Sequence, residues 1–187
     1  LRKNIDVLTL TATPIPWTLQ LSIAGLRDLS IIETAPPERK PVVSTVAKRD
    51  DLLLAGVLAR ELERDGQVFW VNNRVQGIER VVEYVQKLAP GAKIGLAHGQ
   101  MPERQLEDSM HKFWHGETQI LVCTAIIESG LDLPRANTLV VDGAQMFGLG
   151  QLYQLRGRVG RSDRQAYAIF VAPQEISGKA GQFSAFR

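Results

Sequence analysis

Cysteine is almost absent from this sequence, which has one, Cys123, in 187 residues. A single cysteine cannot form an internal disulfide, and this one lies in the apolar run of residues 120–123. We therefore expect it to pack as a small core residue of a protein kept in a reducing compartment. Long apolar runs are absent too, since none approaches the ~18 residues that span a bilayer, and the first residues carry no signal-peptide pattern. The default expectation is a cytoplasmic location with no membrane partner.

A strong net charge of either sign is also lacking. Lysines and arginines number 22 against 20 aspartates and glutamates, which gives a formal net charge of +2. Overall charge therefore does not indicate nucleic-acid binding, and any such contact must come from local clusters such as Arg156, Arg158, Arg161 and Arg164. The length, with 44% hydrophobic and 22% charged residues, is ample for one α/β domain with a real core.

Two motifs that hold a nucleotide are missing from the chain. There is no G-x-x-x-x-G-K-[ST] phosphate loop and no acidic box for Mg²⁺. This chain alone therefore lacks the parts that usually hold a nucleotide and its metal ion. The sequence also lacks an initiator methionine and starts almost directly in a strand-like run, so we expect it to be a piece of a longer protein.

What the sequence does contain is an alternation of strand and helix patterns. Asp50 and Asp51 precede a helical pattern with leucines at 54, 58 and 62, and Gly66 follows it. Later helical patterns run from about residue 75 to 88 and from 106 to 114, and the second should bury Leu106, Met110, Phe113 and Trp114. Strand patterns occupy residues 42–46, 67–71, 93–97, 119–124, 138–141 and 166–171. The alternation predicts an α/β fold, a mostly parallel sheet flanked by helices on both faces, with ligands at the carboxyl ends of the strands.

The most informative stretch is residues 151–161, Q-L-Y-Q-L-R-G-R-V-G-R. At 100° per residue, Gln154, Arg158 and Arg161 share one helical stripe, and the apolar residues Leu152, Leu155 and Val159 gather on the opposite face. The two glycines should each cost ~1 kcal/mol against alanine in a helix, which indicates a close approach to the backbone. The alternative is a solvated basic helix.

This stretch resembles the last motif of superfamily 2 helicases and translocases, Q-x-x-G-R-x-G-R. In that family the motif lies in the second of two RecA-like motor lobes and faces the ATP bound to the first lobe. The resemblance implies that Arg158 and Arg161 are arginine fingers and that Gln154 is a polar partner near the γ-phosphate. ATP and Mg²⁺ would be held mainly by the first lobe, which this chain lacks. A permanently charged planar donor stabilises the charge that develops in phosphoryl transfer.

Two other strand ends carry candidate nucleic-acid contacts. Asn72, Asn73 and Arg74 combine two cap residues and a cation at an expected helix start, which suits a backbone phosphate. The alternative is simple helix capping with a surface arginine. His98-Gly99-Gln100 resembles the A-H-G-Q-M segment of the bacterial transcription-repair coupling factors. No metal site is expected, because His111 and His115 share a helix face without a third ligand.

Residues 124–134, T-A-I-I-E-S-G-L-D-L-P, resemble motif V of the same superfamily. The resemblance implies that Thr124 touches a phosphate of the nucleic acid, that Gly130 allows close approach, and that Asp132 reaches the ribose of ATP. Asp132 could instead cap a turn before Pro134.

The segment T-A-T-P-I-P near the start resembles the coupling motif of RecG and of the coupling factors. There Thr11 and Thr13 would relay the nucleotide state to the nucleic-acid track, although a threonine-rich strand end with local hydroxyl bonds would read the same way. Trp17 stands where these relatives usually have arginine, which puts any arginine-borne role there in doubt.

These resemblances imply a division of the chain. Residues 1–25 would end the first motor lobe and form a linker, residues 26–172 would form the second RecA-like lobe, and residues 173–187 would begin a truncated translocation hairpin. The expected function is that of an ATP-dependent double-stranded DNA translocase that displaces stalled RNA polymerase, with polymerase and excision-repair proteins bound by modules outside this chain. The alternatives are a RecG-type fork-remodelling helicase and a non-catalytic DNA-binding regulator with a degenerate motor lobe.

Overall fold

The computed structural model describes residues 40–124 and 135–173. The chain divides into two units, Leu1–Ala35 and Pro36–Arg187, and every described residue belongs to the second. The expectations for the coupling residues Thr11 and Thr13, and for Gly130 and Asp132 of the motif V segment, lie outside the described residues.

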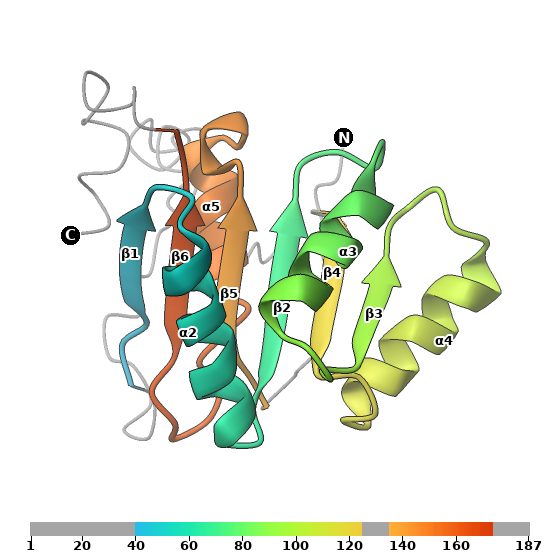
Figure 1. Cartoon of the computed structure of the whole chain (residues 1–187), viewed down its shortest axis with the longest axis horizontal. Helices are drawn as coiled ribbons and strands as arrows, with labels where there is room; N and C mark the ends of the chain where they lie inside the picture. Colours follow the sequence, from blue (N-terminus) through green and yellow to red (C-terminus); the bar gives the residue numbers. More distant parts are fainter. Residues whose placement is uncertain (1–39, 125–134, 174–187) are drawn as a thin grey trace, which may run out of the picture. The chain divides into compact units, whose positions relative to one another are not determined.

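A six-stranded sheet, parallel throughout, forms the centre of the described part (Figure 1). Its spatial order is β1-β6-β5-β2-β4-β3. The strands are β1 (Val43–Ala47), β2 (Gln67–Asn72), β3 (Ile94–Ala97), β4 (Ile120–Thr124), β5 (Ala136–Asp142) and β6 (Tyr167–Val171). These bounds lie within one or two residues of the expected strands, so the alternating pattern predicted the sheet correctly.

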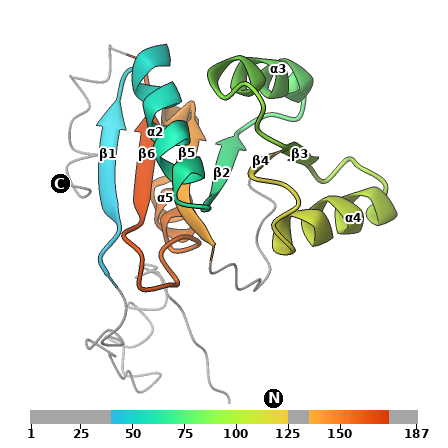
Figure 2. The ribbon, with the colours of Figure 1, turned by 60° about the horizontal axis from the view of Figure 1, so that its bottom comes forward.

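Helices cover both faces of the sheet, as the sequence predicts. The helices are α2 (Asp51–Glu63), α3 (Ile78–Leu88), α4 (Glu103–Trp114) and α5 (Leu149–Arg156), with a short 3-10 helix η1 (Ala144–Met146). Side chains of α2 and α3 pack in one apolar cluster, and side chains of α4 and α5 pack in another. In Figure 2, α3 and α4 lie on opposite sides of β3.

The central strand β2 shows why both faces are covered. Val68 and Trp70 point into the α2–α3 cluster, while Phe69 and Val71 point into the α4–α5 cluster. All four side chains are almost fully buried. A strand that is apolar at every position must be covered on both sides, because successive side chains point to opposite faces of the sheet.

Two local signals, at Asp50 and Cys123, were correct, and one on α4 was not. Asp50 is the N-cap of α2, and its carboxylate accepts hydrogen bonds from the backbone N–H of Leu52 (2.9 Å) and Leu53 (3.1 Å). Cys123 is fully buried, as expected, and burial raises the pKa of its thiol. On α4, Phe113 is buried but Trp114 is 50% exposed, so the expectation that Trp114 belongs to the core is wrong. At 100° per residue, two adjacent positions cannot both face the sheet squarely.

Candidate functional site

The candidate residues lie at two opposite edges of the sheet. Because all strands are parallel, their carboxyl ends meet at one edge and their amino ends at the other. We call these the carboxyl edge and the amino edge. Asn72, His98 and Thr124 end or follow strands at the carboxyl edge, whereas the residues after α5 lead into the amino end of β6. Arg158 and Arg161 therefore lie at the amino edge, whereas the sequence predicts ligands at the carboxyl edge.

The arginines follow α5 in a non-helical turn. The helix ends at Arg156, with Gly157 as its C-cap, and Gly160 adopts the left-handed conformation with φ 75°. The prediction of one helical stripe through Gln154, Arg158 and Arg161 is therefore wrong. Glycine permits left-handed backbone at little steric cost, so Gly160 turns the chain out of the helical path. We call residues 157–164 the arginine turn.

The apolar side of this stretch packs as the sequence predicts. Leu152, Leu155 and Val159 are buried in the α4–α5 cluster. Gln154 and Arg161 are exposed, and Arg158 is half-buried. The backbone N–H of Arg158 donates to the carbonyl of Leu155 (3.0 Å), which keeps one turn of hydrogen bonding beyond the helix end. The turn thus fixes its apolar residues in the core while its cations stay at the surface.

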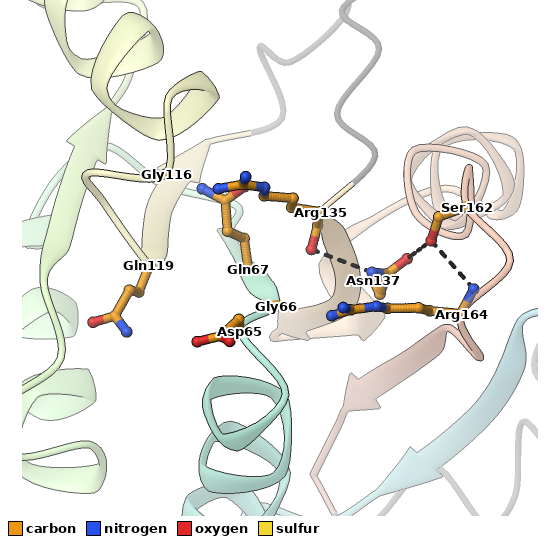
Figure 3. Close-up of a pocket in the computed structure, with 9 residues that line it drawn as sticks. All are labelled: Asp65, Gly66, Gln67, Gly116, Gln119, Arg135, Asn137, Ser162 and Arg164. Carbon is orange, nitrogen blue, oxygen red and sulfur yellow. Dashed lines mark hydrogen bonds between the residues drawn. The ribbon is translucent and has the colours of Figure 1, made fainter.

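A cavity of about 650 Å³ opens at the amino edge beside the arginine turn (Figure 3). Its lining includes Gln67, Arg135, Asn137, Ser162 and Arg164. The Ser162 hydroxyl donates to Asn137 Oδ1 (3.0 Å) and accepts from the backbone N–H of Arg164 (3.4 Å). Sequence reasoning missed Asn137 and Ser162, because no motif joins positions 25 residues apart.

At the carboxyl edge, the residues after β2 form a turn of their own. Asn72 Oδ1 accepts from the backbone N–H of Asn73 (2.9 Å), and its Nδ2 donates to the carbonyl of Arg74 (3.3 Å). Asn73 Nδ2 donates to the carbonyl of Met146 (3.1 Å). Helix α3 begins only at Ile78, so neither asparagine caps it and the capping prediction is wrong. These amides instead hold the turn that carries the exposed Arg74.

Two buried polar atoms at the same edge have no hydrogen-bond partner within the described part of the chain. They are Thr124 Oγ1 and His98 Nδ1. The strand register places Thr124 beside Asn72, and His98 directly follows Ala97, which pairs with Cys123. Gly99 and Gln100 continue from His98 into an exposed turn. Buried polar atoms normally have partners, so these two indicate a place where a ligand supplies them.

An ion pair that the sequence did not suggest lies at the carboxyl edge, between the ends of β1 and β5. Arg49 binds both carboxylate oxygens of Asp142, and its guanidinium lies 5.1 Å from the ring centroid of Tyr84. The Tyr84 hydroxyl donates to Asp51 Oδ1 (2.6 Å). Burial, followed by this hydrogen bond, raises the pKa of Tyr84 to about 12. The cluster joins the residues after β1 to the end of β5 and to α3.

The histidine pair lies on the surface of α4. The Nε2 atoms of His111 and His115 are 3.0 Å apart, and both residues are exposed. Within residues 40–124 and 135–173, no group of three or more histidine, cysteine, aspartate or glutamate side chains is placed to hold a metal ion. In the same ranges, no helix is both long and apolar enough to cross a membrane.

Curated proteins of high sequence identity show which proteins this chain is similar to. A transcription-repair-coupling factor of Mycobacterium bovis is 53% identical over 176 residues, which are 94% of this chain and 14% of the relative. One from Staphylococcus epidermidis is 56% identical over 173 residues, 92% of this chain and 15% of the relative. The chain thus spans about one seventh of the length of these relatives.

A solved structure and a family model complete the comparison. The structure of RecG bound to a three-way DNA junction is similar, with a TM-score of 0.77 and 35% identity, over 94% of this chain and 24% of that one. This likeness, together with the parallel sheet, confirms the RecA-like fold of helicase C-terminal lobes. The model of the helicase conserved C-terminal domain matches residues 48–163, more than half of the chain. The chain therefore belongs to the family of helicase C-terminal domains.

Proposed function

We propose that this chain is the second RecA-like motor lobe of an ATP-dependent double-stranded DNA translocase that couples transcription to DNA repair. The observation that carries the proposal is the separation of two surfaces on one lobe. The arginine turn lies at the amino edge, and unpartnered Thr124 and His98 atoms lie at the carboxyl edge. A DNA translocase needs two separate surfaces on this lobe, because ATP and DNA must be bound at different places.

On the nucleotide side, Arg158 and Arg161 would approach the γ-phosphate of ATP when the two lobes close. ATP, with Mg²⁺, would supply the phosphoryl group that is transferred to water. The arginine turn fits this task because guanidiniums keep their charge and donate in a planar fork. Gln154 would lie beside them as a polar partner near the γ-phosphate. Gly130 would allow close approach, and Asp132 would reach the ribose of ATP.

On the nucleic-acid side, the carboxyl edge would follow one strand of duplex DNA. Thr124 and His98 would donate to or accept from the backbone through the atoms that lack protein partners. Asn72 and Asn73 would shape the turn, Arg74 would meet a phosphate, and Gly99 and Gln100 would line the same path. Phosphate contacts of this kind position a protein on DNA without reading its sequence.

The rest of the proposal concerns the division of the chain and the partners of the lobe. Residues 1–25 would end the first lobe and carry Thr11 and Thr13 as coupling residues, residues 26–172 would form this lobe, and residues 173–187 would begin a translocation hairpin. The first RecA-like lobe of the same protein would be the immediate partner. RNA polymerase and excision-repair proteins would bind modules of the full-length protein outside this chain. The protein would act in the bacterial cytoplasm. The 53% and 56% identities to coupling factors support this reading over a RecG-type helicase, at 35%.

The test uses the full-length protein that contains this lobe. ATP hydrolysis is measured with and without duplex DNA, and release of RNA polymerase is measured on DNA that carries a stalled elongation complex. We expect DNA-stimulated hydrolysis and ATP-dependent polymerase release. Stimulated hydrolysis with branched-junction unwinding but no polymerase release would favour the RecG-type function. Absence of hydrolysis would indicate a non-catalytic regulator.

A further inference from the structure

The arginine turn is attached to the amino edge of the sheet by a contact that lies outside any motif. Ser162 Oγ donates to Oδ1 of Asn137 (3.0 Å), and Asn137 Nδ2 donates to the carbonyl of Arg135 (3.3 Å). Figure 3 shows this chain of hydrogen bonds running from Arg135 through Asn137 to Ser162 and on to the backbone of Arg164. Ser162 directly follows Arg161 in the sequence.

Asn137 is placed for this contact by an irregularity of the sheet. In the pairing of β2 with β5, Gln67 lies opposite Ala136 and Val68 lies opposite Thr138, so Asn137 is the extra residue. An extra residue of this kind leaves the hydrogen-bond ladder and redirects a side chain. Asn137 is fully buried, although asparagine is usually exposed. A buried amide is retained at low cost only where it is hydrogen-bonded, as it is here.

Two further contacts hold the rest of the turn. Arg164 Nη1 donates to the carbonyl of Arg64 at the end of α2. Gln165 Nε2 donates to the carbonyl of Pro41 (2.7 Å), just before β1. The segment that follows Arg161 is therefore tied to three elements of the lobe, β5, α2 and the approach to β1. A turn attached in this way loses little conformational entropy when its cations meet a ligand.

We infer that Asn137 and Ser162 are positioning residues, which fix the arginine turn so that Arg161 reaches the transferring phosphoryl group in the correct geometry. This inference rests on the proposed function, because it assigns the contact a role through Arg161. The physical reason is that catalysis by a charged donor depends steeply on placement, and a shift of about 1 Å can cost on the order of 10²-fold in rate. Neither Asn137 nor Ser162 needs to touch ATP.

The test compares Ser162→Ala, Ser162→Thr and Arg161→Ala in the full-length protein. Ser162→Ala removes the donor to Asn137 without adding bulk, and we expect kcat for ATP hydrolysis to fall by ~10-fold to ~10²-fold with KM for ATP nearly unchanged. Ser162→Thr keeps a hydroxyl and should restore most of the rate. Ser109→Ala, a serine on α4 away from the turn, is the matched control and should leave kcat as in the parent.

A double variant separates positioning from general damage. If Ser162 acts through Arg161, then Ser162→Ala should cause no further loss in a protein that already carries Arg161→Ala. Hydrogen exchange of peptides covering residues 157–164 should become faster in Ser162→Ala, with the melting temperature lowered by a few degrees at most.

The outcomes distinguish this inference from the proposed function. If Arg161→Ala slows hydrolysis strongly while Ser162→Ala behaves like the parent, or if Ser162→Ala adds its own loss to the residual rate of the double variant, the positioning role is overturned and the motor function stands. A threonine variant as slow as the alanine variant would also overturn it. If Arg161→Ala hydrolyses ATP at the parent rate, both the finger assignment and the positioning role fall together.

Discussion

Gly160 packs so closely against Ala166 that a Cβ built on Gly160 would lie 3.0 Å from the Cβ of Ala166. The same atom would lie 3.1 Å from Cγ2 of Val42, and the backbone φ of Gly160 is 75°. The arginine turn thus meets the residues just before β1 and β6 at a point where a Cβ would force its neighbours to shift by a few tenths of an ångström. The close contacts and the left-handed backbone are two independent reasons why glycine is favoured at position 160.

The first prediction is that Gly160→Ala destabilises the fold. A left-handed non-glycine residue costs roughly 1–2 kcal/mol, and the close contacts should add to that cost because the side chains of Ala166 and Val42 must shift. The measurement is the free energy of unfolding in urea, followed by circular dichroism on the chain and its variant. A loss below about 0.5 kcal/mol, the range of ordinary surface changes, would show that the turn yields easily.

Gly56 provides the matched control. It lies within α2, is exposed, and a Cβ there would meet no atom within 4 Å. Gly56→Ala should stabilise the chain by up to ~1 kcal/mol, because alanine is the better helix former. Opposite signs at the two glycines would separate the steric effect from the loss of backbone freedom.

The second prediction concerns Tyr84, whose pKa is about 12 in the folded chain. The ordinary tyrosine pKa is about 10, so the folded state holds its proton more tightly than the unfolded state. The contribution to stability is therefore complete below pH ~10 and is lost as the pH rises through about 12. Ultraviolet titration of tyrosinate, with Tyr84→Phe to identify the signal, measures the shift.

Asp51→Asn should lower the pKa of Tyr84, since it removes the nearby carboxylate charge. An unshifted titration would contradict the assigned hydrogen bond.

Much of the fold could be predicted from the sequence, because buried strands and helices have characteristic patterns of apolar residues. Strand β2 is apolar at consecutive positions, and α2 carries its leucines at helical spacing, so element type and sheet class followed from pattern. The bounds agreed to within one or two residues for the strands. The core position of Cys123 followed from its apolar neighbours in the same way.

The parts that sequence reasoning missed depend on conformation or on distant contacts. The spacing of Arg158 and Arg161 fits a helix, but the helix ends at Arg156 with Gly157 as its C-cap, and Gly160 then adopts left-handed backbone with φ 75°. Asn72 and Asn73 are good cap residues, yet their side chains bond within their own turn and to Met146. The contact between Asn137 and Ser162 required the bulge in β5, which no local pattern indicates.

The third prediction is that the isolated chain folds but does not hydrolyse ATP. The sequence has no phosphate loop and no acidic box for Mg²⁺. Without those parts the arginines have no bound γ-phosphate to meet. Circular dichroism should show an α/β spectrum with a cooperative melt, and phosphate release should match a heat-inactivated sample. Turnover that survives repurification would contradict this.

The fourth prediction is that Arg74 binds a DNA phosphate without reading bases. Arg74→Ala in the full-length protein should weaken DNA binding evenly across sequences and lower the salt slope of log Kd by about one unit. Lys87→Ala is the control, because Lys87 is an exposed cation in the last turn of α3, at the far end of that helix from Arg74. Fluorescence anisotropy over a salt series measures both. A sequence-selective loss would mean base contacts, and an unchanged slope would make Arg74 an ordinary surface residue.

The last prediction separates the arginines of the turn by function. Arg161→Ala in the full-length protein should leave ATP binding nearly intact and reduce turnover by ~10³-fold or more, equivalent to ~4 kcal/mol of transition-state stabilisation. Arg158→Ala should act likewise, because both follow the helix end in the turn. Arg161→Lys keeps the charge but not the planar fork, so it should recover little.

Arg156 and Arg164 are the internal controls for these variants. The Arg156 guanidinium lies 5.0 Å from the ring centroid of Tyr153, on the helix itself, and Arg164 donates to the carbonyl of Arg64. Alanine at either position should therefore cost much less turnover than alanine at Arg161. Nucleotide binding by stopped flow and steady-state hydrolysis on the same four alanine variants decide the matter. Equal losses at Arg156 and Arg161 would show that the turn acts as a general basic surface, and the finger assignment would then be wrong.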